Sequence, residues 1–320
     1  MVWVYSFSKS RSLETFGCIT SNQYLFLTSP PYRLFMFCEV DGVNVYYEAI
    51  GEGHPILMLH GYGIDHRVMT GCMEPIFEKR PGYKRIYMDL PGMGKSKAPG
   101  WLEDTDQVLD IVIGFSEMAI PEGDFLVAGE SYGGYLARGM VYKIPERLGG
   151  VLLICPVMVG DRSRRQLPPR TVFVRDEKLL ASIDPEDKKF FERMLLLQDK
   201  RRWERFQQDI LPGRRMMDAA LLDRLKKHGY ECTFDVDRIK PFDRPSLILV
   251  GRQDTSVGYK DAIRLIDNYS RGTFAILDRA GHGLEVEQEE VFNCLVNEWL
   301  DRVEEYREKF ETNKSAEKSV

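Results

Sequence analysis

The sequence predicts an α/β fold, in which a mostly parallel β-sheet carries helices on both faces and a helical segment is inserted between two strands. Short apolar runs such as ILML, VLLI and LILV recur along the chain, and stretches with helical periodicity separate them. Unbroken apolar runs are typical of strands that are buried on both faces, as in parallel sheets. The alternation stops over residues 156–243, where helical periodicity continues without strand runs.

The elements follow from these patterns in chain order. An opening hairpin covers residues 37–40 and 43–50 and turns at Asp41-Gly42, because an Asp-Gly pair suits a tight hairpin turn. The later strands are expected at 55–60, 84–89, 125–129, 151–155, 246–251 and 273–278. The helices between them are expected at 103–118, 132–143, 259–268 and 287–311.

Residues 156–243 are expected to form two to four helices that are inserted as a cap between two strands of the sheet. One helix begins at Asp184, since an aspartate N-cap, a proline and two acids follow one another there, and another ends at Gly229. The core domain then comprises residues 36–155 and 244–312, and residues 313–320 form a frayed tail. Most of the aromatic and apolar residues of the insertion are expected to pack against the core.

Residues 1–35 are expected to lie outside the fold. Their apolar clusters are interrupted by Pro30-Pro31 and Arg33, so we find no continuous apolar segment with a cleavage site of a secretory signal. Met36 directly precedes the first predicted strand. We therefore expect that residues 1–35 result from a translation start upstream of Met36.

Composition limits the classes of partner. The chain has 320 residues, is 43% hydrophobic and carries a net charge of −5, so it can bury a large core and has no basic excess for nucleic acid. No apolar window of about 18 residues predicts a membrane span. The six cysteines are scattered without a CxxC pair, which favours reduced, buried thiols and a cytoplasmic location. A small molecule is the expected partner, and a homodimer remains open.

Residues 129–133 (GESYG) fit the G-x-S-x-G pattern and lie between a predicted strand and a predicted helix. Such a sharp turn exposes the hydroxyl of Ser131, and side chains at Gly129 and Gly133 would collide across it. The start of the following helix adds partial positive charge where an oxyanion would form. We therefore expect Ser131 to be a nucleophile.

A serine needs a base, and the base needs an orienting acid. Among five histidines, His282 follows the last predicted strand in a loop of small residues, whereas His54 and His228 are expected at the surface and His66 near a cleft. Asp254 follows the strand at 246–251. Serine, aspartate and histidine thus each follow a strand, in the order of one known class of catalytic triad. The triad predicted is Ser131, Asp254 and His282, with Glu130 in a structural role.

An oxyanion hole requires two hydrogen-bond donors. The backbone N–H of Tyr132, directly after the nucleophile, is the first candidate. Residues 60–63 (HGYG) end the strand at 55–60, and the backbone N–H of Tyr62 is the second, with His60 and Gly61 supporting the loop.

Together, the motifs HGYG, DLPGMGKS (89–96), GESYGG, GRQD (251–254) and AGH (280–282) resemble the α/β-hydrolase family from about residue 37 to residue 300. The resemblance implies a mostly parallel eight-stranded sheet, a helical cap over residues 156–243 and no cofactor. It points to a serine hydrolase that cleaves an ester-like bond through an acyl-enzyme.

Several alternatives stay open within this resemblance. Epoxide hydrolases and haloalkane dehalogenases use an aspartate nucleophile where this chain has Ser131, and prolyl aminopeptidase-like members carry tryptophan where it has Tyr132. Carbon–carbon bond hydrolases, thioesterases, lactonases and acyltransferases share the triad, and some members of the fold are non-catalytic receptors. GKS at 94–96 does not complete a P-loop, since Asp89 stands where glycine is required, and no HExxH or Cys/His cluster predicts a metal.

Overall fold

The computed structural model describes residues 33–228 and 230–317. Within them, eight strands form one sheet in the order β1-β2-β4-β3-β5-β6-β9-β10. The first two pairings, β1 with β2 and β2 with β4, are antiparallel, and all later pairings are parallel. The strands are β1 (Arg33–Val40), β2 (Val43–Ile50), β3 (His54–Leu59), β4 (Tyr83–Met88), β5 (Phe125–Glu130), β6 (Leu148–Ile154), β9 (Ser246–Gly251) and β10 (Gly272–Leu277). The predicted fold class is confirmed.

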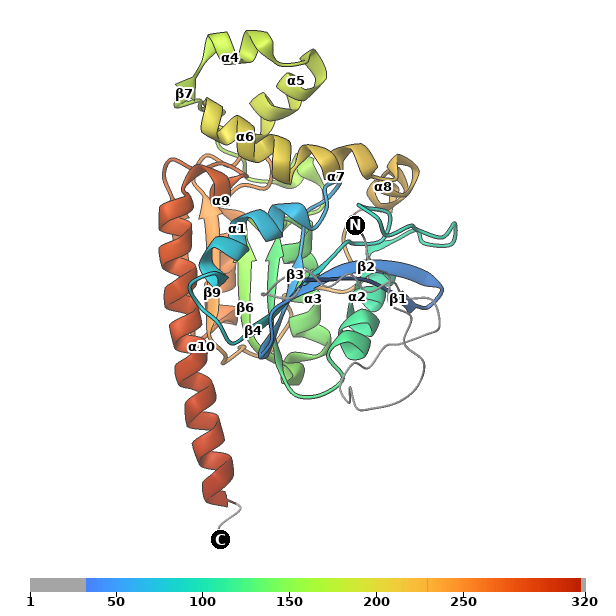
Figure 1. Cartoon of the computed structure of the whole chain (residues 1–320), viewed down its shortest axis with the longest axis vertical. Coiled ribbons are helices and arrows are strands. Elements are labelled where there is room, and N and C mark those ends of the chain that lie inside the picture. Colours follow the sequence, from blue (N-terminus) through green and yellow to red (C-terminus); the bar gives the residue numbers. More distant parts are fainter. Residues whose placement is uncertain (1–32, 229, 318–320) are drawn as a thin grey trace, which may run out of the picture.

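The connections place helices on both faces of this sheet (Figure 1). Helix α1 (Arg67–Phe77) links β3 to β4, whereas α2 (Thr105–Ala119) and α3 (Tyr132–Lys143) belong to crossovers that run the other way along the strand order. Because such crossovers are right-handed, α1 lies on one face and α2 and α3 on the other. The long C-terminal helix α10 (Glu289–Glu317) contacts α1 and so shares its face.

Between β6 and β9 the chain leaves the sheet and forms α4 (Glu177–Ser182), α5 (Pro185–Met194), α6 (Lys200–Asp209), α7 (Leu211–Met216) and α8 (Ala219–Lys227). A 3-10 turn (Arg162–Arg164) and two short strands, β7 (Val174–Arg175) and β8 (Leu197–Gln198), complete this insertion. It lies beyond one end of the sheet, with α6 against α1 and against α9 (Leu284–Glu287) (Figure 1). Five α-helices exceed the expected two to four.

Aspartates explain why these short helices form. The carboxylate of Asp184 accepts a hydrogen bond from the N–H of Glu186, as the N-cap pattern predicted. Asp176, Asp199 and Asp218 cap α4, α6 and α8 in the same way. The interior of the insertion is aromatic, since Phe191 packs edge-on against both Trp203 and Phe206. Gly229, the predicted helix end, lies outside the described residues.

Both domain ends differ from expectation. Strand β1 begins at Arg33 and pairs with β2 from Arg33 opposite Ile50 onward, so residues 33–35 belong to the sheet and were wrongly placed outside the fold. The strand begins this early because residues 33–36 find hydrogen-bonding partners along β2. Helix α10 continues through Glu317, so most of the predicted frayed tail is helical. Residues 1–32 and 318–320 lie outside the described residues.

Helix α1 was missed because its sequence contains two helix breakers, Gly71 and Pro75. Packing overrides this local preference: the helix buries Met69 and Met73 in the core. A Cβ at Gly71 would lie 2.5 Å from the carboxylate carbon of Asp209, so glycine lets α1 approach α6 closely. Residues 261–268, expected as α-helix, form a 3-10 helix instead.

Candidate active site

The turn between β5 and α3 holds Ser131 in an unusual backbone conformation, with φ of 52° and ψ of −109°. The flanking glycines are required by close backbone approach. A Cβ at Gly129 would lie 2.2 Å from the carbonyl oxygen of Gly133, and a Cβ at Gly133 would lie 2.2 Å from that of Leu59. Strain of this kind costs on the order of 1–3 kcal/mol and is typical of functional sites. The turn projects the Ser131 side chain at the end of the sheet.

Three side chains from separate strand ends meet at this turn. Oγ of Ser131 lies 2.9 Å from Nε2 of His282, and Nδ1 of His282 lies 2.8 Å from Oδ2 of Asp254. The other carboxylate oxygen of Asp254 accepts hydrogen bonds from the N–H groups of Ser256 (2.7 Å) and Val257 (3.0 Å). The backbone therefore fixes Oδ1 of Asp254, and Oδ2 holds the imidazole of His282.

The electrostatics of this relay favour a basic imidazole. Burial opposes the charged form of His282, but the charge of Asp254, the hydrogen bond to it and the charges of Glu130 and Glu285 outweigh burial and raise the pKa to about 9. Burial likewise disfavours the Asp254 carboxylate, yet the charge and hydrogen bond of His282 hold its pKa below the usual value. Each group thus stabilises the charged form of the other.

The loop after β3 is held beside the turn by His60. Its Nε2 accepts a hydrogen bond from the N–H of Leu90 at 2.9 Å, so Nδ1 carries the proton and donates to the carbonyl of Gly61 at 2.8 Å. Burial lowers the pKa of His60, which keeps the ring neutral in this role. The loop then brings Tyr62 next to Tyr132, whose rings meet edge-on with centroids 5.8 Å apart.

Tyr230 of the insertion completes this aromatic group, which sequence reasoning missed. Its ring centroid lies 4.8 Å from that of Tyr62 and 4.7 Å from that of Tyr132. The hydroxyl of Tyr62 also donates to the carbonyl of Leu222 in α8. The insertion therefore contacts both residues expected to bind an oxyanion. No motif in the sequence marks Tyr230, because its contact with Tyr62 and Tyr132 depends on how the insertion packs over the end of the sheet.

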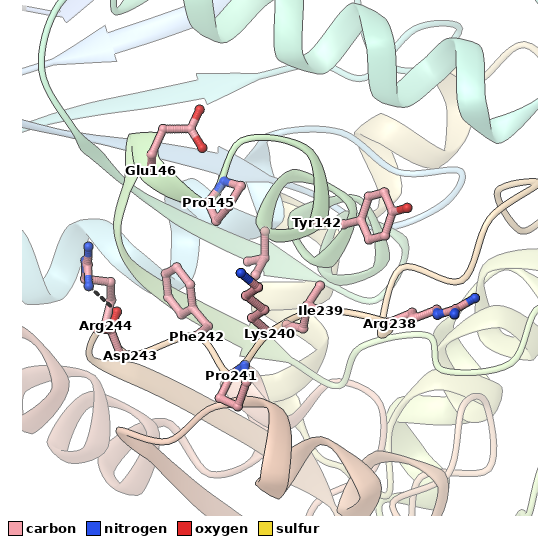
Figure 2. A pocket seen from close by; sticks show the side chains of 11 residues that line it. Tyr142, Pro145, Glu146, Arg238, Ile239, Lys240, Pro241, Phe242, Asp243 and Arg244 are labelled. Atoms are coloured by element: carbon pink, nitrogen blue, oxygen red, sulfur yellow. Dashed lines mark hydrogen bonds and ion pairs between the residues drawn. The ribbon is translucent and has the colours of Figure 1, made fainter.

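Access to the triad is narrow, because Ser131 is only 6% exposed and His282 only 8%. One pocket of about 350 Å³ lies elsewhere, between the end of α3 and the segment that enters β9 (Figure 2). Its lining includes Tyr142, at the far end of α3 from Ser131. A helix of 12 residues is about 18 Å long, so this pocket is separate from the triad.

The other histidines take structural positions. His66 is buried between Asp89 (Nδ1 to Oδ1, 2.6 Å) and Glu48 (Nε2 to Oε1, 2.9 Å), so it does not line a cleft. His54 is buried rather than at the surface, because it begins the central strand β3. His228 is exposed, as expected.

Two groups among the described residues bring metal-ligand types together, namely Cys155 with Asp254 and His282, and Asp65 with His66 and Asp89. In both groups the imidazole nitrogens already hydrogen-bond to other side chains. Their donor atoms are therefore committed to the relay and to the buried ion pairs. The described cysteines are free, but Cys294 is exposed, contrary to the expectation of buried thiols, and Cys18 lies outside the described residues.

A sheet of this order, with a strained serine after its fifth strand, defines a serine hydrolase of the α/β-hydrolase fold. The sequence pattern of the family described as serine aminopeptidase, S33, matches residues 54–289, and the chain belongs to this family. An α/β-superfamily hydrolase from Oenococcus oeni PSU-1 is 32% identical, with a TM-score of 0.74 over 81% of this chain and 96% of that one.

Two further relatives carry the names of two kinds of hydrolase. A 2-hydroxymuconate semialdehyde hydrolase from Pseudomonas putida is 26% identical over 78% of this chain and 88% of its own length. A pimeloyl-[acyl-carrier protein] methyl ester esterase from Shewanella woodyi is 24% identical over 81% of this chain and 98% of its own length. An esterase from Exiguobacterium antarcticum, 20% identical with a TM-score of 0.61 over 82% of this chain and 97% of that one, shares the fold. In the described residues, no helix is long and apolar enough to cross a bilayer.

Proposed function

We propose that this serine hydrolase cleaves an ester-like bond of a small molecule through an acyl-enzyme on Ser131. The observation that carries the proposal is the continuous relay from Oγ of Ser131 through His282 to Asp254, with both links shorter than 3.0 Å. His282 accepts the serine proton as Oγ attacks the carbonyl carbon, and then donates that proton to the leaving alcohol. A water molecule, deprotonated by the same nitrogen, releases the acid. Asp254 holds the imidazole tautomer throughout.

The backbone N–H groups of Tyr62 and Tyr132 form the oxyanion hole in this proposal. Tyr132 begins helix α3, so its N–H belongs to the unpaired first turn and carries partial positive charge. His60 supports the loop of Tyr62 through its two hydrogen bonds. Loss of one such donor typically lowers kcat by about 10²–10³-fold.

The insertion at 156–243 acts as the cap that shapes the substrate site. Support comes from Tyr230, which packs on Tyr62 and Tyr132, and from the small exposure of the triad beneath it. The substrate therefore enters between the insertion and the sheet. Cap residues near this entrance then select the acyl or alcohol part.

A carbon–carbon bond hydrolase is the second candidate, favoured by the similarity to the 2-hydroxymuconate semialdehyde hydrolase. The same relay would serve either reaction. A thioesterase, a lactonase or an acyltransferase would form the same acyl-enzyme. A receptor would bind the small molecule without turnover. A cytoplasmic location and a homodimer remain proposals from the sequence, which cell fractionation and light scattering would test.

Turnover of p-nitrophenyl esters of increasing chain length tests the function. We expect release of p-nitrophenol by the wild type and loss of at least about 10³-fold in kcat for Ser131→Ala. Carbon–carbon cleavage is assayed in parallel on a vinylogous 1,5-diketone. Turnover of the diketone without turnover of any ester would favour the second candidate, and binding without turnover of either would favour a receptor.

A further inference from the structure

Glu130, the residue before the nucleophile, faces the same imidazole nitrogen as Ser131. Its Oε1 lies 3.5 Å from Nε2 of His282, and the residue is only 4% exposed. It ends strand β5, where the backbone turn that presents Ser131 begins. The carboxyl group therefore occupies the interior side of the site and not the solvent.

The second oxygen of Glu130, Oε2, is buried and makes no side-chain hydrogen bond within residues 33–228 and 230–317, and the backbone of Gly61 favours the charged form of the carboxyl group. It lies against Gly61 of the loop after β3, where a Cβ would sit 2.2 Å from Oε2. The carboxyl group is therefore held between the backbone of Gly61 and Nε2 of His282.

Several elements contribute charge to this space. Asp254 faces it from the loop after β9, and Glu285 faces it from α9. Glu130 also interacts with Cys72 of α1, Cys155 after β6 and Tyr230 of the insertion. Burial raises the pKa of Glu130, whereas the positive charge of His282 and the backbone of Gly61 favour its carboxylate form. Glu130 and His282 therefore titrate as a coupled pair, in which the charged imidazole favours the carboxylate.

We propose that Glu130 is a positioning residue for His282, whose carboxylate faces Nε2 and stabilises the imidazolium that forms during catalysis. The inference rests on the proposed function of the triad. As Oγ of Ser131 attacks, its O–H bond breaks and the proton moves to Nε2. The new positive charge then lies between two carboxylates, Asp254 at Nδ1 and Glu130 on the side of Nε2. Glu130 itself exchanges no proton with the substrate.

The test is the pH profile of kcat/KM for Glu130→Gln, which keeps the shape of the side chain and removes its charge. Without that charge the imidazole is less basic, so we expect the midpoint of the ascending limb to fall by about one pH unit. We also expect kcat on the plateau to fall about tenfold while KM stays close to that of the wild type. Thermal unfolding of each variant establishes that it is folded.

Glu285→Gln is the matched control, because Glu285 is also buried but acts on His282 less strongly than Glu130. Its midpoint should move less. Glu130→Asp keeps the charge but withdraws it from Nε2, and its midpoint should lie between those of the wild type and Glu130→Gln. Should Glu130→Gln not fold, Glu130→Asp is compared directly with the wild type and with Glu285→Gln.

An active wild type whose midpoint is unchanged in Glu130→Gln, or changed no more than in Glu285→Gln, overturns this inference alone. A wild-type protein whose Ser131 does not react with a fluorophosphonate overturns the proposed function, and this inference with it. The two failures are therefore distinguishable.

Discussion

Oγ of Ser131 lies 2.9 Å from Nε2 of His282, although 151 positions separate the two residues along the chain. The parallel sheet brings them together, because strands β5 and β10 run in the same direction and end at the same edge. The distance is that of a hydrogen bond that is already formed, so the serine proton has a defined acceptor.

Asp254→Asn should lower kcat by about 10⁴-fold with little change in folding, because an amide N–H facing Nδ1 would favour the wrong imidazole tautomer. The measurement is steady-state hydrolysis of an activated ester. Asp261→Asn is a suitable control, since Asp261 is also buried and hydrogen-bonds to Gln166 instead of to His282. Equal activity of the two variants would contradict the role of Asp254.

Gly133→Ala should unfold more easily than the wild type by about 2 kcal/mol or more, because the new Cβ would lie 2.2 Å from the backbone carbonyl of Leu59. Gly100→Ala provides the control, as a Cβ there meets nothing within 4 Å. Denaturant unfolding of both variants gives the comparison. A Gly133→Ala protein as stable as Gly100→Ala would mean that the turn is less tightly packed than described.

Tyr230→Ala should change ester selectivity, because removal of the ring opens space next to Tyr62 and Tyr132. We expect kcat/KM to increase for long acyl chains relative to short ones, by about 10-fold if one large side chain was excluding them. Tyr142→Ala removes a ring that stacks on Phe234 at the separate pocket shown in Figure 2 and should leave selectivity unchanged. The same selectivity in both variants would argue against the insertion as a cap.

The buried His66 should make stability depend on pH. Burial opposes its charge, but hydrogen bonds to Asp89 and Glu48 outweigh burial and raise its pKa from 6.5 to about 9. A raised pKa means that its contribution is complete below about pH 6.5 and is lost as the pH rises through 9. Between these values the free energy of unfolding of the wild type should fall by about 3 kcal/mol more than that of His66→Gln.

The raised pKa of His282 acts in the same direction, but it is present in both proteins and cancels in the comparison. Chemical denaturation at a series of pH values provides the data. Parallel stability curves for wild type and His66→Gln would show that His66 is not held in its charged form.

The fold and the meeting of the predicted triad residues followed from local features of the sequence. A buried parallel strand is a short apolar run, and a serine turn that excludes side chains requires glycine on both sides, so Gly129 and Gly133 mark it. The carboxyl ends of parallel strands share one edge, so the sequence alone predicts that Asp254 and His282 lie near Ser131, as they do.

Features that depend on tertiary contacts were not predictable in this way. Helix α1 contains Gly71 and Pro75 and is stabilised by packing that no local pattern reveals. Tyr230 reaches the site only because the insertion folds back over the sheet. The first strand begins at Arg33 because a partner strand extends beside it, whereas the sequence before Met36 lacks a clear strand pattern.

Covalent labelling with a fluorophosphonate, followed by mass spectrometry of the modified peptide, tests whether Ser131 is the activated nucleophile. The relay described above predicts a single modification on Ser131, faster at pH values where His282 is neutral, and no modification in Ser131→Ala. Modification of a different residue, or labelling that persists undiminished in Ser131→Ala, would contradict the assignment of the active site.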